Sequence, residues 1–571
     1  MLVLLVLILS GCQAEMERSA KPSVDWSRGL LLGRSNIKQP VALAVDGDEH
    51  VHLAWCYDAL FYVHLDGQGR VLWNDQLSID LPQPRKPQLL VDGKNVVHLA
   101  WLSRDQDRQI LFHTRIDGQG QFALPEQLSA DDENVSNFQM YLAPSGEIEF
   151  VLASTSTAEQ PHIWYLPLTD PAQRMLLVDG GIDPSVRVDA HGTIHLAWLQ
   201  PTAQTSRDVY YSILHLPDLT LSPQRLTRFE FGESAVYDGP TVGFDAEYVY
   251  VLWSVQNLGG GLTPTAAFSY YVAFEKEQAA TVNARTLGVP PRADPNYEAY
   301  VGVFGYTKLD LLSQTEILYS SDFVNTPATV SGQQDELPVA VSLMTHSQSD
   351  SRIQIALGVF REGRQVGFQL ANETRNASLM PSLIADADSN LHLAWLDTAG
   401  FSEFDIYYAS NAPRVRRWLN RTTGQDVAFA IASLAWGVFS ALSLLPIVLI
   451  WFLGGLVITV GHFTFTGYET MQSVGGKVGL GLGVVAYAVL KLIFLPGLHA
   501  STPFLRFVPQ SLESIVGIAV PILILALGLF VAWLRLKRDP TLTTFRGYLT
   551  FALTDTLLTL VLYAPGMFGQ G

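Results

Sequence analysis

Four histidines recur at one position of a repeated segment. The segment "DAHGTIHLAW" at 189–198 has near-copies "DGDEHVHLAW", "DGKNVVHLAW" and "DADSNLHLAW" that begin at residues 46, 92 and 386. Each copy carries a carboxylate and, six residues later, an imidazole, and these two groups together can bind a metal ion or move a proton. The four histidines are His52, His98, His195 and His392. The pattern therefore indicates either four related chemical sites or one structural device used four times.

Repetition favours the structural interpretation. Equivalent positions in repeated units are related by rotation, so they repeat a packing environment and do not converge on one ion. We predict that each imidazole bonds a neighbouring turn or backbone group. The "DADSN" run at 386–390 resembles the start of a calcium loop, but no bidentate glutamate follows at the required spacing, so a hairpin turn is predicted instead. We predict no catalytic residue, no metal site and no cofactor.

The repeated unit is predicted to be a small antiparallel meander. A proline five or six residues before the Asp opens each copy, and the Asp with a small neighbour makes a tight turn. An aromatic-rich strand such as "LFYVHL" or "VYYSILHL" follows "HLAW". Alternation in "VHLAW" places Val, Leu and Trp on one face and His and Ala on the other. We expect Trp to fill the widening space between neighbouring sheets and Ala to let the next sheet approach.

The number of units predicts the fold. A degenerate copy contains Pro240, Asp245 and Trp253, and weaker meanders begin at residues 138, 299 and 339. Eight units with periods of about 43 to 56 residues fit four-stranded propeller blades. We predict an all-β propeller of about eight blades. Seven is the alternative, because the sixth and seventh units are faint and can merge.

The two ends of the repeat region predict how the propeller closes. The last unit stops at Ser410, one strand short, while "DWSRGLLLG" at 25–33 precedes the first full unit and resembles an orphan outer strand. Pairing the two would remove an exposed sheet edge. We therefore predict closure by these two segments.

The first residues, "MLVLLVLILSGCQAE", form a short apolar run that ends in Leu-Ser-Gly-Cys. This stretch resembles the lipobox of bacterial lipoprotein signal peptides, and the resemblance implies cleavage before Cys12 and lipidation of its thiol. The missing Lys or Arg before the run departs from that pattern, so a plain signal peptide or a short anchor helix is the alternative. Only Cys56 would remain after processing, which leaves no intramolecular disulfide.

The far end of the chain is apolar. Runs at 427–460, 478–498, 515–534 and 549–563 are each about as long as the ~20 residues that a membrane-crossing helix needs, so we predict an α-helical bundle of four spans. The first run is too long for one straight crossing, and we expect a kink at Pro446 or an interfacial first half.

The charges around these runs predict orientation. The loop "RLKRDPTLTTFR" at 535–546 is basic and should be cytoplasmic, which places the propeller outside the cell after three spans are counted back. Four arginines in "PRVRRWLNR" before the membrane oppose this assignment, and we expect them and Trp418 to act as an interfacial anchor.

Two charges lie deep in the apolar runs. Asp555 is near the middle of the last run and Lys491 in the outer part of the second, at comparable predicted depth. An unpaired charge there costs about 2.5 to 3.5 kcal/mol, so we predict an intramembrane polar pair of Lys491 and Asp555. The alternative is that Lys491 snorkels to the interface and Asp555 is protonated. Glycines at 475, 479 and 483 would let another helix approach the second span.

These features divide the chain into a signal peptide at 1–11, a propeller at 24–410, a juxtamembrane linker at 411–426 and a four-span region at 427–565. The pattern P-x4-D-x5-HLAW in a lipobox-led chain resembles sialidase-like (BNR-type) β-propellers of bacterial envelope proteins. The resemblance implies the fold only. The S-x-D-x-G-x-T-W box of sialidases is missing, and their arginine triad and Tyr-Glu pair have no matching positions in this sequence.

Charge and composition limit the function. With 36 Lys and Arg against 54 Asp and Glu, the net charge of −18 argues against a nucleic-acid partner. We predict a module at the bacterial cell membrane whose extracytoplasmic propeller binds or senses a glycan, a peptide or a partner protein, with the lipid bilayer as its other partner. The alternative is a sialidase-like glycoside hydrolase, which would need two carboxylates facing each other across a pocket. Transport by the bundle is a third, weaker possibility, because four mostly apolar spans offer few groups to a polar substrate.

Overall fold

The structure is a computed structural model of the chain, and it describes residues 25–568 with several gaps. The gaps are 78, 80–81, 118–119, 156–159, 217, 259–263, 277, 288–306, 309–327, 330–334, 348–349, 373, 375, 429–444, 468–469, 495–509 and 540. The described residues form two compact units, one that ends at Arg421 and one that begins at Thr422.

The first unit is a β-propeller, in which each blade runs from an inner strand to an outer strand. Blade one contains β2 (Ala42–Val45), β3 (Val51–Cys56), β4 (Leu60–Leu65) and β5 (Val71–Gln76). Blade two contains β6 (Pro84–Val91), β7 (Val97–Asp105), β8 (Arg108–Ile116) and β9 (Glu126–Gln127). Blade three contains β10 (Asn134–Leu142), β11 (Ile148–Thr155), β12 (His162–Pro167), the 3-10 turn η1 (Pro171–Gln173) and β13 (Met175–Asp179).

Blade four contains β14 (Ile182–Val188), β15 (Ile194–Ala203), β16 (Ser206–Leu214) and β17 (Gln224–Glu230). Blade five contains β18 (Ala235–Phe244), β19 (Tyr248–Leu258), β20 (Pro264–Glu275) and β21 (Arg285–Thr286). Blade six contains β23 (Ala328–Thr329), β24 (Leu337–Ser347), β25 (Asp350–Arg361), β26 (Arg364–Leu370) and β22 (Thr307–Lys308). Blade seven contains β27 (Ser378–Ala385), β28 (Leu391–Gly400), β29 (Glu403–Ser410) and β1 (Leu30–Ser35).

The described residues form seven sheets, so the propeller has seven blades, the lower of the two predicted counts. The difference from eight arises where the repeat is faintest. Of the meander predicted from residue 299, only β22 is described, and it pairs with β26 of the blade that holds the meander from residue 339. The rest of the 299 meander lies outside the described residues. The sixth and seventh predicted units therefore share one sheet.

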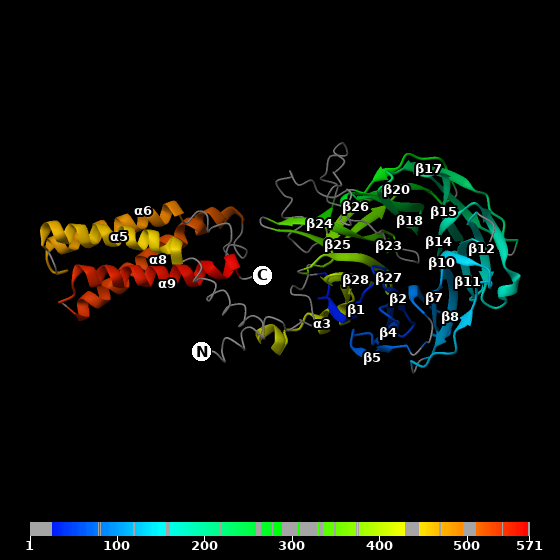
Figure 1. The fold of residues 1–571 in the computed structure, drawn as a ribbon, viewed down its shortest axis with the longest axis horizontal. Coiled ribbons are helices and arrows are strands. Elements are labelled where there is room, and N and C mark those ends of the chain that lie inside the picture. The colour runs from blue at the N-terminus through cyan, green and yellow to red at the C-terminus, as the bar shows by residue number, and fades with distance from the viewer. Residues whose placement is uncertain are drawn as a thin grey trace. The chain divides into compact units, whose positions relative to one another are not determined.

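The inner strands form a closed ring. β2 contacts β6, and contacts continue from β6 to β10, β14 and β18, through β23 to β27 and back to β2. Figure 1 shows the labels of β2, β10, β14, β18 and β27 toward the middle of the propeller, with those of β5, β8, β12 and β17 at its periphery. Because neighbouring blades are related by rotation, their inner strands all begin at the same end of the ring.

The predicted closure is confirmed. β1 pairs antiparallel with β29, with Leu30 opposite Tyr408 and Ser35 opposite Phe404. The N-terminal strand thus becomes the outer strand of blade seven, and both partners lose an exposed edge. The segment before β1 is fixed as well. The Ser27 amide donates to the Ser410 carbonyl at 2.8 Å, and the Ser410 amide donates to the Ser27 hydroxyl at 2.9 Å.

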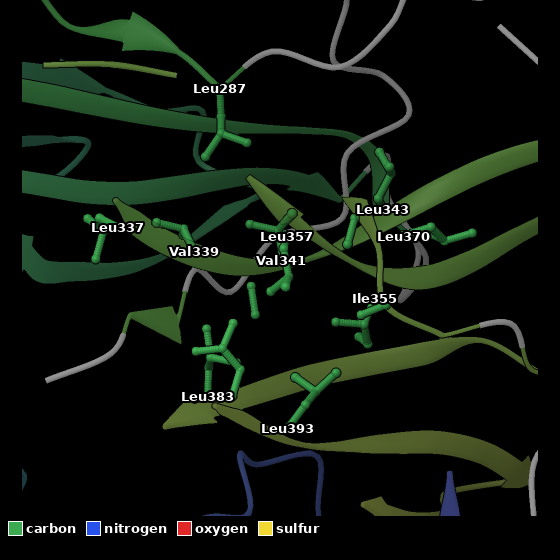
Figure 2. Packing of buried hydrophobic residues seen from close by; sticks show 14 of the residues in the cluster. Leu287, Leu337, Val339, Val341, Leu343, Ile355, Leu357, Leu370, Leu383 and Leu393 are labelled. Atoms are coloured by element: carbon green, nitrogen blue, oxygen red, sulfur yellow. The ribbon is translucent and has the colours of Figure 1, made fainter. Parts of the chain in front are cut away.

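The two faces of the "HLAW" strands pack as predicted. In blade four, Ile194, Leu196 and Trp198 join one buried cluster toward blade three, while Ala197 joins another toward blade five. Figure 2 shows the same principle between blades six and seven, where Leu383 and Leu393 lie against Val339 and Leu357. Because both sheet faces are covered, successive side chains of the "HLAW" strands are buried on either face.

A short helix, α3 (Pro413–Leu419), follows the last blade. Its Val415 and Leu419 are buried in the core of blades one and seven. Trp418 packs on the same core, with the Arg70 guanidinium 4.5 Å from its ring centroid. The propeller surface thus supplies apolar and cationic partners for Trp418, and its role as an interfacial anchor stays a prediction.

The second unit contains four long helices, α5 (Leu445–Thr466), α6 (Val474–Phe494), α8 (Gln510–Arg538) and α9 (Thr544–Phe568). Each is long and apolar enough to cross a membrane. The first half of the predicted 427–460 run lies mostly outside the described residues. Close approach of α5 and α6 follows from glycine, since a Cβ at Gly479 would lie only 2.6 Å from His462 Nδ1.

Candidate functional site

The repeated histidines form a polar relay at one end of their blades, which we call the turn end. In blades one, four and seven, the histidine Nδ1 lies within hydrogen-bonding distance of a tyrosine hydroxyl on the next strand. The pairs are His52–Tyr62 at 2.6 Å, His195–Tyr211 at 2.7 Å and His392–Tyr408 at 2.8 Å. The predicted structural environment is thus confirmed, with a tyrosine as the second partner.

The turn aspartate completes each relay. Asp189 Oδ1 accepts from the amides of His191 and Thr193 at 2.9 Å, and its Oδ2 lies 3.4 Å from His195 Nε2. Burial alone would raise the pKa of Asp189, but the Thr193 amide and His195 outweigh burial, and the pKa lies below its usual value. The 386–390 segment repeats this turn, since Asp386 Oδ1 accepts from the Asn390 amide at 2.7 Å. It is a hairpin turn, as predicted.

Other blades keep the arrangement with different groups. Blade two has His113 in place of the tyrosine, 3.0 Å from His98. Blade five has Tyr250 at the histidine position, and its hydroxyl bonds Asp245 Oδ2 directly at 2.6 Å. A buried polar pair at this position therefore recurs for packing and stability.

The opposite end of the inner strands differs from blade to blade, and we call it the axial end. Five inner strands carry a β-bulge near their first residues, between 85 and 88, 135 and 137, 182 and 185, 238 and 241, and 379 and 382. Lys86, Asp183, Gly239 and Met380 in these bulges have positive φ. A bulge redirects a side chain out of the regular ladder, and strained φ values of this kind concentrate at functional sites.

Polar groups from four successive blades meet at the axial end. Asn137 Nδ2 donates to Asp183 Oδ1 at 3.2 Å, and the Tyr237 hydroxyl lies 3.5 Å from Asp183 Oδ2. Lys86 Nζ donates to the Ser136 carbonyl at 2.9 Å. We call Lys86, Asn137, Asp183 and Tyr237 the axial cluster, and all four side chains are half-buried.

The electrostatics of the axial cluster bring its acid and its base closer to neutrality. Burial raises the pKa of Asp183, although Lys86 and the hydrogen bonds from Asn137 and Tyr237 oppose the shift. Burial likewise lowers the pKa of Lys86, with Asp183 and Asp238 acting against it. Opposed shifts of this kind are typical of groups that exchange a proton with a ligand or orient one by hydrogen bonding.

An aromatic surface borders this cluster. The guanidinium of Arg207, near the start of β16, lies 5.3 Å from the Tyr237 ring centroid and 5.0 Å from that of Phe231. The axial end therefore offers donors, acceptors, both charges and an aromatic face within one region. Groups of these kinds can hold a ligand rich in hydroxyl or carboxylate groups.

Sequence reasoning missed the axial cluster, although a signal for it exists. The repeat is recognisable by its prolines, and the residue directly before Pro87, Pro184, Pro240 or Pro381 changes from blade to blade. A position that varies inside an otherwise constant repeat indicates where the blades differ in function. Asn137 lacks the proline signal and could only be found from the spacing.

Two predictions concern site residues outside the propeller, the pair of Lys491 and Asp555 and the lipidation site Cys12. The structure brings Lys491 and Asp555 together, with 2.6 Å between Lys491 Nζ and Asp555 Oδ2 and both side chains fully buried. The hydroxyls of Tyr487 and Thr559 complete the group at 2.6 Å from Asp555 and 2.8 Å from Lys491. Cys12, the predicted lipidation site, lies outside the described residues.

One group of metal-ligand type occurs among the described residues. It consists of Asp46, His52 and His64 in blade one. It includes one of the four repeated histidines, His52, and takes its third member, His64, from the neighbouring strand of the same blade.

Several solved structures are similar to this chain. An ulvan lyase of a new polysaccharide lyase family, bound to a GlcA and Rha3S unit, has a TM-score of 0.44 and 10% identity over 69% of this chain and 96% of its own. The α-L-arabinanase of Penicillium chrysogenum has a TM-score of 0.36 and 11% identity over 58% of this chain and 94% of its own. An α-L-arabinofuranosidase of Fusarium graminearum has a TM-score of 0.33 and 9% identity over 58% of this chain and 94% of its own. No family model and no curated protein matches the sequence. At such low similarity, function has to be argued from this chain's own residues.

Proposed function

We propose that the propeller is a binding or sensing module whose axial end recognises a glycan. The observation that carries this proposal is the axial cluster, in which Lys86, Asn137, Asp183 and Tyr237 from four blades lie at one end of the inner strands. Glycan hydroxyls both donate and accept hydrogen bonds, so they fit a site that presents a carboxylate, an ammonium, an amide and a phenol together. The Tyr237 ring under Arg207 adds an aromatic surface against which a sugar face can pack.

The test is a binding screen of the full-length protein in detergent against an array of neutral and acidic glycans and of peptides. Tyr237→Phe and Asp183→Asn should weaken binding at least about tenfold, the equivalent of one hydrogen bond to a charged group. Tyr211→Phe is the matched control, because it removes the same hydroxyl from the turn end of blade four. Equal losses in the two tyrosine variants, or binding to peptides alone, would contradict a glycan site at the axial end.

A second function, cleavage of a carbohydrate by a sialidase-like hydrolase, is favoured by one observation. Asp183 has the raised pKa that a general acid needs, and the Lys86 charge acts on both Asp183 and Asp238. A reducing-end assay on the ligands that bind would distinguish the two functions. Turnover that is lost in Asp183→Asn while binding is retained would establish the hydrolase.

We further propose that the propeller is extracytoplasmic and that the mature chain is lipidated at Cys12. Arg535, Lys537 and Arg538 gather at the end of α8, and basic residues there favour the cytoplasmic side. The arginines before the membrane argue less strongly against this orientation, because Arg414 binds Glu49 of the propeller at 2.7 Å. A cytoplasm-active reporter should function when inserted after Lys537 and fail after Ser410, and the opposite pattern would reverse the orientation.

A further inference from the structure

Blade one adds an imidazole to the relay that it shares with blades four and seven. His64 on β4 stands directly across from His52 in the strand register. The equivalent position is Ile213 in blade four and Ser410 in blade seven. Blade one alone of these three therefore places a second histidine beside the turn aspartate.

The added imidazole brings three ligand atoms together. His52 Nε2 lies 3.3 Å from Asp46 Oδ2, and one ligand atom each from Asp46, His52 and His64 lie within 4.8 Å of one another. Around a tetrahedral ion with bonds of about 2.0 to 2.1 Å, neighbouring ligand atoms are about 3.3 Å apart. The three groups thus need only small side-chain rotations to converge on one ion.

The surroundings support these groups as ligands. The Tyr62 hydroxyl lies 2.6 Å from His52 Nδ1, which leaves Nε2 directed at Asp46, and such outer contacts orient the histidine ligands of metal sites.

One side of the group is open to solvent. The side chain of His52 is 5% exposed and that of Asp46 10%, whereas His50 in the turn is 33% exposed. His50 Nδ1 lies 3.0 Å from His64 Nε2 and 3.9 Å from Asp46 Oδ2. His50 thus borders the group on the side from which an ion would enter.

We propose that Asp46, His52 and His64 form a binding site for one divalent transition-metal ion such as Zn²⁺, with His50 beside its fourth, solvent-facing position. Two imidazoles and a carboxylate suit Zn²⁺ and its first-row neighbours, whereas Ca²⁺ and Mg²⁺ prefer oxygen ligands alone. The site lies at the turn end, so it is independent of the proposed glycan site at the axial end. Blades four and seven, with the same Asp and His but no third ligand, bind no ion under this proposal.

The experiment uses the full-length, tag-free protein in detergent, stripped of metal with a chelator and titrated with Zn²⁺ or Co²⁺. We expect one metal per chain after desalting, measured by elemental analysis, and a visible Co²⁺ absorption band. Zn²⁺ should raise the unfolding temperature, because an ion that binds only the folded state stabilises it. Absence of a stoichiometric ion in the wild-type protein would overturn the proposal.

The chain supplies its own matched variants. His64→Ile should abolish stoichiometric binding and yet fold, because Ile213 occupies that position in blade four. His113→Tyr is the control, since it removes a buried histidine from blade two and installs the tyrosine that blades one and four already have at this position. Equal metal content in His64→Ile and wild type, or an equal loss in His113→Tyr, would overturn the site.

A second variant keeps the proposal testable if His64→Ile does not fold. His50→Asn uses the residue that blade seven carries at this position, Asn390, and it alters only the border of the site. We expect affinity for Zn²⁺ to fall about 10- to 100-fold, as for other groups that support metal ligands. Unchanged affinity would remove His50 from the site and contradict the proposed entry side.

Discussion

The two ends of the inner strands follow different rules. At the turn end, blades one, four and seven repeat the same aspartate, histidine and tyrosine with nearly the same distances. At the axial end, the equivalent bulge positions hold Lys86 in blade two and Asp183 in blade four. A group that recurs in several blades serves the packing within each blade. A group that occurs once can respond only to something at that one place.

This difference separates stability from recognition within single strands. Asp189 and Asp183 lie only six residues apart in the chain, and yet their pKa values shift in opposite directions. The turn aspartate is held by amides that favour its charge, while the axial one is buried among groups that compensate it only in part. We therefore expect substitutions at the turn end to damage folding and those at the axial end to damage binding.

Opening the ring should cause the largest loss of stability, because the turn end and the axial end both depend on a closed propeller. Deleting 25–33 removes fully buried Trp26, nearly buried Leu32 and most of the ladder to β29. We expect a loss of about 5 kcal/mol or more, or roughly 10 °C or more in the unfolding temperature of the full-length protein. Gly33→Ala is a graded version, since its Cβ would lie 2.6 Å from the Trp55 ring. An unchanged melting curve for the deletion would contradict closure by β1.

The buried pair of Lys491 and Asp555 tests whether a polar contact that occurs only once has to be functional. Lys491→Gln or Asp555→Asn alone should cost about 3 to 5 kcal/mol, because each leaves a buried charge without its partner. The double variant should recover much of that loss. Folded yield in detergent, measured by size-exclusion chromatography, decides the matter. If the single losses simply add, the two residues are not coupled, and Asp555 becomes a functional acid in its own right.

A matched pair of aspartates, at the two ends of one inner strand, tests the comparison directly. Asp189→Ala leaves two amides and His195 without their acceptor, so we expect a loss of about 3 kcal/mol in unfolding free energy. Asp183→Asn keeps a similar shape and should change stability by about 1 kcal/mol or less. Chemical denaturation of both variants is the measurement. A larger loss in Asp183→Asn would show that the axial cluster also serves folding.

The smallest effect is a difference in pH dependence. The pKa of Asp189 is lowered, so its contribution to stability is present above the ordinary aspartate value of about 3.9 and is lost as pH falls further. The pKa of Asp183 is raised, so its charge costs stability above that value, and the cost disappears as the group is protonated. Asp183→Asn removes this cost, so its effect on stability relative to the wild type should become less favourable on acidification. The loss of stability in Asp189→Ala should disappear only at lower pH. Melting temperatures between about pH 7 and about pH 2.5 would show whether the two curves move in this order.

Much of the fold could be predicted from the repeated segment. The Asp turn, the face alternation of "HLAW" and the missing last strand each have a local physical cause that is visible in the residues. The blade count was harder to predict, because the sheet that holds β22 and β24 joins segments with no repeat signature. The axial cluster could not be predicted, since Asn137 and Asp183 meet only when two blades are placed side by side. The His64 group was missed because His64 does not belong to the repeated segment and meets Asp46 and His52 only through the pairing of β3 with β4.

The closing strand also determines how the propeller responds to pulling. β1 and β29 are antiparallel with Leu30 opposite Tyr408, so the chain enters and leaves the ring at the same end of one ladder. A pull on both chain ends would separate these strands pair by pair, like a zipper, and would not shear them. Before the ladder opened, the force would have to break two hydrogen bonds of Asn420. Its side chain accepts from the Arg28 amide at 2.7 Å and donates to the Trp26 carbonyl at 3.2 Å. Mechanical load applied through the two ends thus acts first on the closing blade and on α3, which packs on blades one and seven.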